Sequence, residues 1–346
     1  MRPINTFILS IIAASFLCVT NAQAADIVNV YSARKEALIK PLLDEFSATT
    51  SIKVNLITGK ADALLKRLQV EGSASPADVF ITVDAGRLHR AKQAGVLKPV
   101  SLALLEQRIP QALRDSAGYW YGLTLRARPI IYAKQRVQLN ELSTYEELAS
   151  KTWAGRICLR SSQAIYNQSL VAATMDSIGA EATLNWMQGM VNNLAKPPSG
   201  GDVDQLKAVA AGVCDATIAN TYYLGRLINS SKPAEQAVAS NLAVFWPNQS
   251  GEGGQGRGAH FNVSGAGMTK YGKHPEQAKA LLEYLASDAA QRWYADINNE
   301  YPVVAGVGIS ETLKGFGRYK MDPINLEILG QNNRQAVQLM DRAGWR

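Results

Sequence analysis

The sequence predicts an α/β protein with two doubly wound lobes joined by a hinge. Its 346 residues are two to three times the length of a usual domain of ~100–150 residues. Strand-like and helix-like stretches alternate along the chain, and no long low-complexity linker divides it. Because 47% of the residues are hydrophobic, disorder, collagen and a coiled coil are excluded, and each lobe can bury its own core.

The first half of the mature chain reads as β-α-β-α-β. Short apolar-rich or alternating runs mark the strands, and apolar residues three or four positions apart mark the helices. The expected elements are strand 27–31, helix 38–46, strand 52–56, helix 61–68 and strand 77–81. Successive β-α-β units imply a parallel sheet with helices on both faces.

A similar alternation returns in the second half of the chain. The expected elements are strand 156–159, helix 168–178, helix 203–211, strand 214–220 and helix 222–228. Short strands should cross between the lobes, with 123–133 and the glycine-rich 251–267 as candidates. We expect a first lobe of residues 25–125 and 251–300 and a second lobe of residues 126–250 and 301–346.

Residues 1–24 have the pattern of a signal peptide. Arg2 is followed by an apolar run over 7–19 and then by the small-x-small sequence Ala22-Gln23-Ala24, which places the mature start near Ala25. No later stretch approaches the ~20 apolar residues of a membrane helix. We therefore expect a soluble protein without stable membrane insertion, located in a bacterial periplasm.

Two cysteines remain after the signal peptide, which contains Cys18. In an oxidising compartment the even number predicts one disulfide, between Cys158 and Cys214. The net charge of the chain is +7, but its basic residues are scattered among acidic ones. Nucleic-acid binding would need them clustered, so we predict no nucleic-acid partner and at most a bias toward anionic ligands.

A tyrosine follows each cysteine at a distance of eight residues. Tyr166 comes just before the helix expected at 168, and Tyr222 and Tyr223 come just after Thr221, a plausible N-cap. Successive helical residues are ~100° apart, so both neighbouring rings can line one cleft. The alternative for any single tyrosine is a packing role with a satisfied hydroxyl.

Three converging phenols suit a ferric ion. Tyrosinate is a hard oxygen donor, but its ordinary pKa of ~10 means that it ionises at neutral pH only beside a strong positive charge. Three phenolates balance the charge of Fe(III), and the presence of only 3 His argues against a site chosen for zinc, copper or nickel.

The stretches SPADVFITVDAGRLHRAKQAGVLKPV, RSSQAIYNQSLVA, ANTYYLGRL, GRGAHFNVSGAG and EYPVVAGV carry a family resemblance. From about Ile27 to Trp345 the chain closely resembles the periplasmic ferric-ion-binding proteins of bacterial ABC iron importers. The resemblance implies the periplasmic-binding-protein type II fold and Fe(III) binding by Tyr166, Tyr222 and Tyr223. It also implies delivery to an inner-membrane ABC permease by a monomeric receptor.

The chain departs from some of these relatives in the first lobe. Where they read YSSRHY and use the His and Tyr as ligands, this chain reads YSARKE, with Lys35 and Glu36 at those positions. Glu36 is a candidate additional ligand, and a solvated acid at a helix start is the alternative. The resemblance is then to the branch in which carbonate or a similar synergistic anion joins the three tyrosines.

Such an anion leaves a negative site that needs cations around it. Arg34, after the first strand, and Arg126 and Arg128, in the first crossing, are the candidates. A guanidinium group pairs bidentately with a planar oxyanion. The alternative for each arginine is an ordinary surface ion pair.

Two other functions remain open. A metal-free receptor for phosphonate, sulfate or a carboxylate would use the arginines and helix N-termini without iron. A periplasmic enzyme would need an acid/base pair or an activated nucleophile, and the sequence offers no such constellation. We expect a non-enzymatic iron receptor, with the anion's identity and the choice of Glu36 or water as a further ligand left open.

Overall fold

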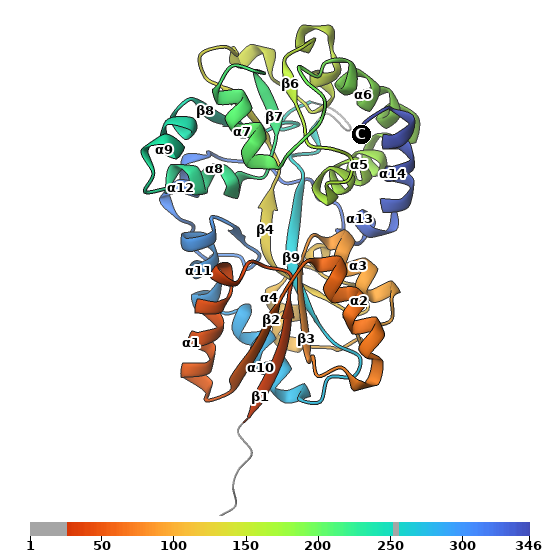
Figure 1. The fold of residues 1–346 in the computed structure, drawn as a ribbon, viewed down its shortest axis with the longest axis vertical. Coiled ribbons are helices and arrows are strands. Elements are labelled where there is room, and N and C mark those ends of the chain that lie inside the picture. The colour runs from red at the N-terminus through yellow and green to blue at the C-terminus, as the bar shows by residue number, and fades with distance from the viewer. Residues whose placement is uncertain (1–25, 252–255) are drawn as a thin grey trace, which may run out of the picture.

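The computed structural model describes residues 26–251 and 256–346. It consists of two lobes, one built on a six-stranded sheet and the other on a four-stranded sheet (Figure 1). The two lobes confirm the expected α/β architecture. The expected signal peptide, residues 1–24, lies outside the described residues.

The strands are β1 (Ile27–Ser32), β2 (Lys53–Thr58), β3 (Val79–Val83), β4 (Tyr121–Ala127), β5 (Ile130–Ala133), β6 (Ile157–Cys158), β7 (Ala216–Ile218), β8 (Leu242–Phe245), β9 (Phe261–Met268) and β10 (Tyr301–Pro302). The helices are α1 (Lys40–Thr50), α2 (Ala61–Glu71), α3 (Ala85–Gln93), α4 (Ala103–Arg108), α5 (Ile165–Ile178), α6 (Ala180–Asn192), α7 (Asp202–Ala210), α8 (Thr221–Ile228), α9 (Pro233–Ser240), α10 (Pro275–Leu285), α11 (Asp288–Asn298), α12 (Glu311–Gly315), α13 (Glu327–Gln331) and α14 (Asn333–Arg342).

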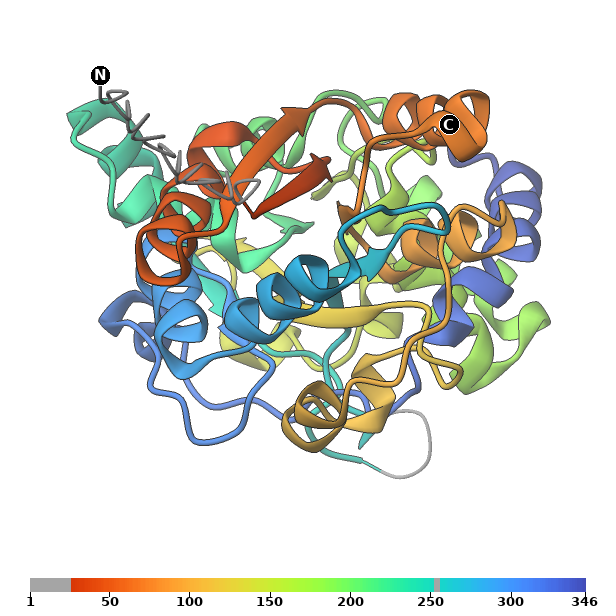
Figure 2. The ribbon, with the colours of Figure 1, turned by 90° about the horizontal axis from the view of Figure 1, so that it is seen from below.

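The sheet of the first lobe has the strand order β10-β4-β9-β3-β1-β2. Strand β1 pairs in parallel with β2 and β3, as the β-α-β-α-β reading predicted. Strand β9 runs antiparallel to β3 and β4, so the complete sheet is mixed. Helices α1 and α11 lie on one side of the sheet and α2 and α3 on the other (Figure 1). In the view along the long axis of the molecule, the strands lie between the helices (Figure 2).

The second lobe has the strand order β6-β7-β5-β8. Here β6 and β7 are parallel, whereas β5 runs antiparallel to both of its neighbours. The chain crosses between the lobes from β4 to β5 and from β8 to β9, within or beside the two expected segments (Figure 1). Strand β10 pairs with β4 in the first-lobe sheet, although residues 301–346 were assigned to the second lobe.

One contiguous hydrophobic core runs through both lobes and includes the fully buried Trp120, Trp153 and Trp345. A smaller cluster around Tyr31 and Phe80 lies under α2. Among the described residues, no helix is both long and apolar enough to cross a membrane.

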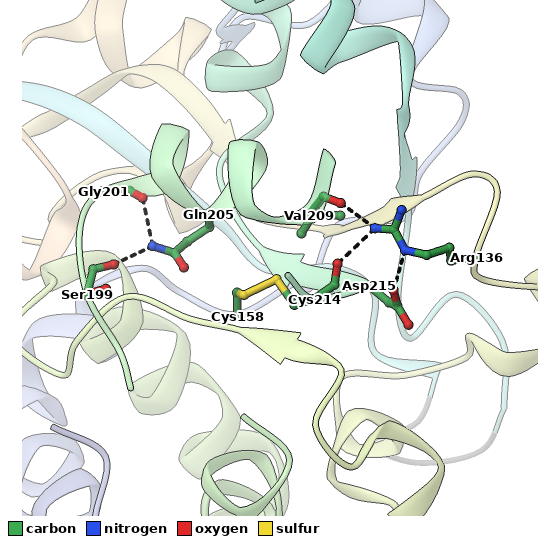
Figure 3. The surroundings of a disulfide bond; sticks show 8 residues. All are labelled: Arg136, Cys158, Ser199, Gly201, Gln205, Val209, Cys214 and Asp215. Atoms are coloured by element: carbon green, nitrogen blue, oxygen red, sulfur yellow. Dashed lines mark hydrogen bonds and ion pairs between the residues drawn. A yellow bond between two sulfur atoms is a disulfide. The ribbon is translucent and has the colours of Figure 1, made fainter. Parts of the chain in front are cut away.

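Cys158 and Cys214 form the expected disulfide, with their Cα atoms 5.8 Å apart (Figure 3). Cys158 ends β6, and Cys214 lies two residues before β7, so the bond fastens neighbouring parallel strands. Next to it, Arg136 donates to the carboxylate of Asp215 at 2.7 Å and to the carbonyl of Cys214 at 3.1 Å. The disulfide therefore holds the strand ends that precede α5 and α8.

Removing this bond should lower the free energy of unfolding by about 4 kcal/mol, because it closes a loop of 56 residues in the unfolded chain. We expect the Cys158→Ala/Cys214→Ala variant to show this loss in urea titrations monitored by circular dichroism. A reductant should lower the free energy of unfolding of the wild-type protein by a similar amount and should not change that of the variant. Equal stability of the oxidised protein and the variant would contradict the prediction.

Candidate metal centre

The three predicted tyrosines lie in the first turns of two helices. Tyr166 is the second residue of α5, and Tyr222 and Tyr223 are the second and third residues of α8. Helix α5 begins three residues earlier than expected, so Tyr166 lies within it. The N-cap of α8 is Asn220 rather than the expected Thr221, because Asn220 has extended backbone angles and Thr221 has already turned into the helix.

The structure brings the three phenols together. The hydroxyl oxygens of Tyr166 and Tyr222 are 3.4 Å apart, and the ring centroids of Tyr222 and Tyr223 are 4.2 Å apart. All three side chains line one cavity of about 360 Å³. First-lobe residues, among them Arg34 and Lys60, line the same cavity, so the site lies between the lobes.

Burial favours the neutral form of Tyr222 and Tyr223. Together with the neighbouring phenol of Tyr166, it raises the pKa of Tyr222 well above the ordinary value and that of Tyr223 to about 12. Arg126 opposes this: its guanidinium donates to the Tyr166 hydroxyl at 3.3 Å and lies 5.0 Å from the centre of the Tyr222 ring. One arginine does not outweigh burial, so Tyr222 and Tyr223 need a stronger positive charge to ionise.

Arg34 and Arg126 both line the cavity, and a buried carboxylate joins them. Glu300 accepts from Arg34 at 3.0 and 3.2 Å and from Arg126 at 3.0 Å. Burial alone would raise the pKa of Glu300, but the two guanidinium groups outweigh it and hold the pKa at about 2. The charge of Glu300 in turn raises the pKa of Arg126, against the lowering effect of burial.

Glu300 is a site residue that the sequence analysis missed. It lies 266 residues from Arg34 and 174 from Arg126, so no local spacing links the three. The only signal is its position at the start of EYPVVAGV, directly before a buried strand.

Arg128 does not reach the cavity. It is 1% exposed, and its guanidinium donates to the side-chain oxygens of Asn167 at 2.6 Å, Asp202 at 2.8 Å and Asn220 at 3.2 Å. Asp202 also pairs with Arg160. These partners lie in or next to the first turns of α5, α7 and α8, so Arg128 connects helix starts rather than facing a ligand.

Glu36 is exposed in the short 3-10 helix Glu36–Leu38 and is not among the residues that line the cavity. Its neighbour Lys35 does line it. Among the described residues, no group of three or more His, Cys, Asp or Glu side chains could hold a metal ion. The phenols are therefore the candidate metal-binding cluster.

The buried Glu300 should make the free energy of unfolding depend on pH. Its folded pKa of about 2 is below the ordinary 4.5, so the stabilisation is complete above about pH 5 and is lost as the pH falls toward 2. We expect Glu300→Gln to lower the free energy of unfolding by about 3 kcal/mol at pH 7, with the gap closing below pH 4.5. Urea titrations at several pH values measure it.

Glu311→Gln removes an exposed carboxylate instead and should leave the free energy of unfolding unchanged over the same pH range. If the difference in free energy of unfolding between the wild-type protein and Glu300→Gln did not vary with pH, the ion-paired state of this carboxylate would be refuted.

Comparison with known proteins identifies the family. Residues 31–292 match the model of the bacterial extracellular solute-binding proteins. The chain is 47% identical to iron uptake protein A1 of Synechocystis sp., covering 92% of this chain and 87% of the relative. It is 30% identical to the Fe(3+)-binding periplasmic protein of Serratia marcescens, covering 97% of this chain and 96% of that protein.

Solved structures agree. The Trichodesmium protein IdiA (FutA), solved in complex with iron and citrate, superimposes with a TM-score of 0.89 at 49% identity, covering 92% of this chain and all of the other. A ferric binding protein from Campylobacter jejuni gives 0.86 at 39% identity, with 92% and 100% covered. The chain belongs to the bacterial extracellular solute-binding protein family.

Proposed function

We propose that this protein is a periplasmic receptor that captures Fe(III) between its lobes and delivers it to an ABC permease. The observation that carries the proposal is the meeting of three phenols in one interlobe cavity, the buried Tyr222 and the half-buried Tyr166 and Tyr223. Similar proteins are named for iron uptake or Fe(3+) binding, and one was solved with iron and citrate.

Fe(III) supplies the charge that the phenols lack. Burial raises the pKa of Tyr222 and Tyr223, so they lose their protons only when a strong cation takes their place. Three phenolate oxygens then balance the metal charge, and the hard donor set suits Fe(III) rather than zinc or copper. Closure of the lobes around the ion sequesters it from water.

An oxygen-donor anion completes the site. Carbonate is the simplest candidate, and the citrate in the Trichodesmium structure is a larger example of the same donor chemistry. We propose that Arg34 and Arg126 hold the anion's charge in place, since both line the cavity. Arg128 and Glu36 are left out of the ligand set, because neither lines it.

The proposal includes no enzymatic step. The relatives are named for iron binding and uptake. We further propose that the receptor acts as a monomer and that, among the described residues, the lobes move as the units 26–125 with 256–302 and 126–250 with 303–346, with β10 counted in the first lobe.

Loss of one phenol should abolish the coloured iron complex. We expect Tyr222→Phe and Tyr223→Phe to lose the orange-red phenolate-to-iron band and to bind iron at least about a hundredfold more weakly, because a ligand is removed. The measurement is a titration of the metal-free chain from Ala25 with a weak ferric chelate, with and without bicarbonate.

Tyr271→Phe is the matched control, since Tyr271 is 41% exposed and lies outside the cavity. It should retain both the band and the affinity. Full affinity in both site variants would refute tyrosine ligation, and stabilisation by anions in metal-free buffer without any colour would favour the anion receptor.

Iron binding should release protons. Each phenol that binds Fe(III) gives up its hydroxyl proton, so we expect about three protons per iron when the metal is delivered from a chelate of known charge. Binding should therefore weaken steeply as the pH falls. A pH-stat titration measures the stoichiometry, and release of one proton or fewer would exclude a three-phenolate site.

A further inference from the structure

Asp84 has a backbone conformation that its role as a helix cap does not require. It follows β3 and is the N-cap of α3, where its Oδ1 accepts a hydrogen bond from the N–H of Gly86 at 2.9 Å. Two other capping side chains, Ser287 and Ser310, have φ angles of −69° and −63°. Asp84 instead has a φ of 82°, which residues other than glycine rarely adopt. Such strain persists only where the surroundings impose it, and it is concentrated at functional sites.

The backbone around Asp84 is fixed to a strand that arrives from the second lobe. The N–H of Asp84 donates to the carbonyl of Val263 at 2.7 Å, and the N–H of Ala85 donates to the Oδ1 of Asn262 at 2.8 Å. Both partners belong to β9, and Asn262 lies opposite Arg126 of β4. Asp84 is therefore held beside the segments that connect the two lobes.

The side chain of Asp84 reaches the second lobe. Its Oδ1 also accepts a hydrogen bond from the hydroxyl of Ser169 at 2.8 Å, and both residues are fully buried. Ser169 lies in α5 three residues after Tyr166, so the two share one face of the helix. Asp84 and Tyr166 also line one small cavity of about 10 Å³, which has room for at most about one water molecule. The first lobe thus contacts the face of α5 that carries the tyrosine.

We propose that Asp84 is a positioning residue for Tyr166. Through its hydrogen bond with Ser169 it holds the tyrosine-bearing face of α5 against the first lobe. A buried hydrogen bond of this kind is electrostatically stronger than one in water, and it fixes the helix precisely. The phenol of Tyr166 is then placed relative to both lobes rather than to the second lobe alone. This inference deepens the proposed function and rests on it.

Ser169→Ala tests the contact between the lobes. It leaves the cap of α3 in place, because Gly86 still donates to Asp84. We expect the iron affinity to fall about tenfold for the loss of one buried hydrogen bond, and the visible band to shift because Tyr166 meets the metal in a changed geometry. The metal-free chain from Ala25 is titrated with a weak ferric chelate. Urea titrations of the same metal-free protein measure the free energy of unfolding separately.

Ser177→Ala is the matched control. Ser177 lies in the same helix, but its hydroxyl donates to the carbonyl of Ala173 within that helix at 3.1 Å. The substitution therefore removes a hydroxyl from α5 without removing a contact with the first lobe. We expect this variant to have the affinity and the visible band of the wild-type protein.

Two substitutions of Asp84 separate its hydrogen bonds from its strained backbone. Asp84→Asn should retain the iron affinity, because its amide oxygen can accept both hydrogen bonds. Burial raises the pKa of Asp84 and so favours the neutral carboxyl, which an amide resembles. Asp84→Gly adopts the positive φ without strain but loses both hydrogen bonds. We expect it to bind iron about tenfold more weakly, as Ser169→Ala does.

An unchanged affinity and an unshifted band in Ser169→Ala would overturn the positioning role, even if its free energy of unfolding fell. An equal loss of affinity in Ser177→Ala, or a loss in Asp84→Asn as large as that in Asp84→Gly, would overturn it as well. Each of these results leaves the proposed function intact. Absence of the visible band in the iron-loaded wild-type protein would overturn the proposed function itself.

Discussion

The tyrosine cluster depends on the buried guanidinium of Arg128. Burying a charge costs several kcal/mol unless it is paired and fully hydrogen-bonded. Here Asp202 supplies the opposite charge, and Asn167 and Asn220 accept two further hydrogen bonds. Because these partners stand at the starts of α7, α5 and α8, the two tyrosine-bearing helices are fixed relative to each other and to the crossing segment between β4 and β5.

A second restraint acts on the same units from the other side. The disulfide fastens β6 to the segment before β7, while Arg128 fastens the helices that follow these strands. The phenols of Tyr166 and Tyr222 are thus presented by two strand-loop-helix units held at both ends. Such preorganisation matters for a metal site, because donors placed in advance do not lose further conformational freedom when the ion binds.

Sequence patterns predicted what depends on neighbours along the chain. Periodicity located β1 to β3 and the helices between them, and cysteine parity predicted the disulfide. Helix starts were less accurate, since α5 begins at Ile165 and its opening residues show no clear apolar period. Glu300 and the role of Arg128 could not be predicted, because their partners lie 39 to 266 residues away and only the folded chain brings them together.

The two walls of the cavity differ in charge, and this difference governs what can enter. The second-lobe wall offers the phenols and one guanidinium, that of Arg226, whereas the first-lobe wall has more cations than carboxylates. A bare metal cation is repelled by that wall, because like charges in a partly desolvated cleft interact more strongly than in water. The anion in the proposed site offsets this repulsion, because its negative charge lies between the metal and the cations of the wall. The charge of the first-lobe wall therefore accounts for the need for an anion beside the ferric ion in the proposed site.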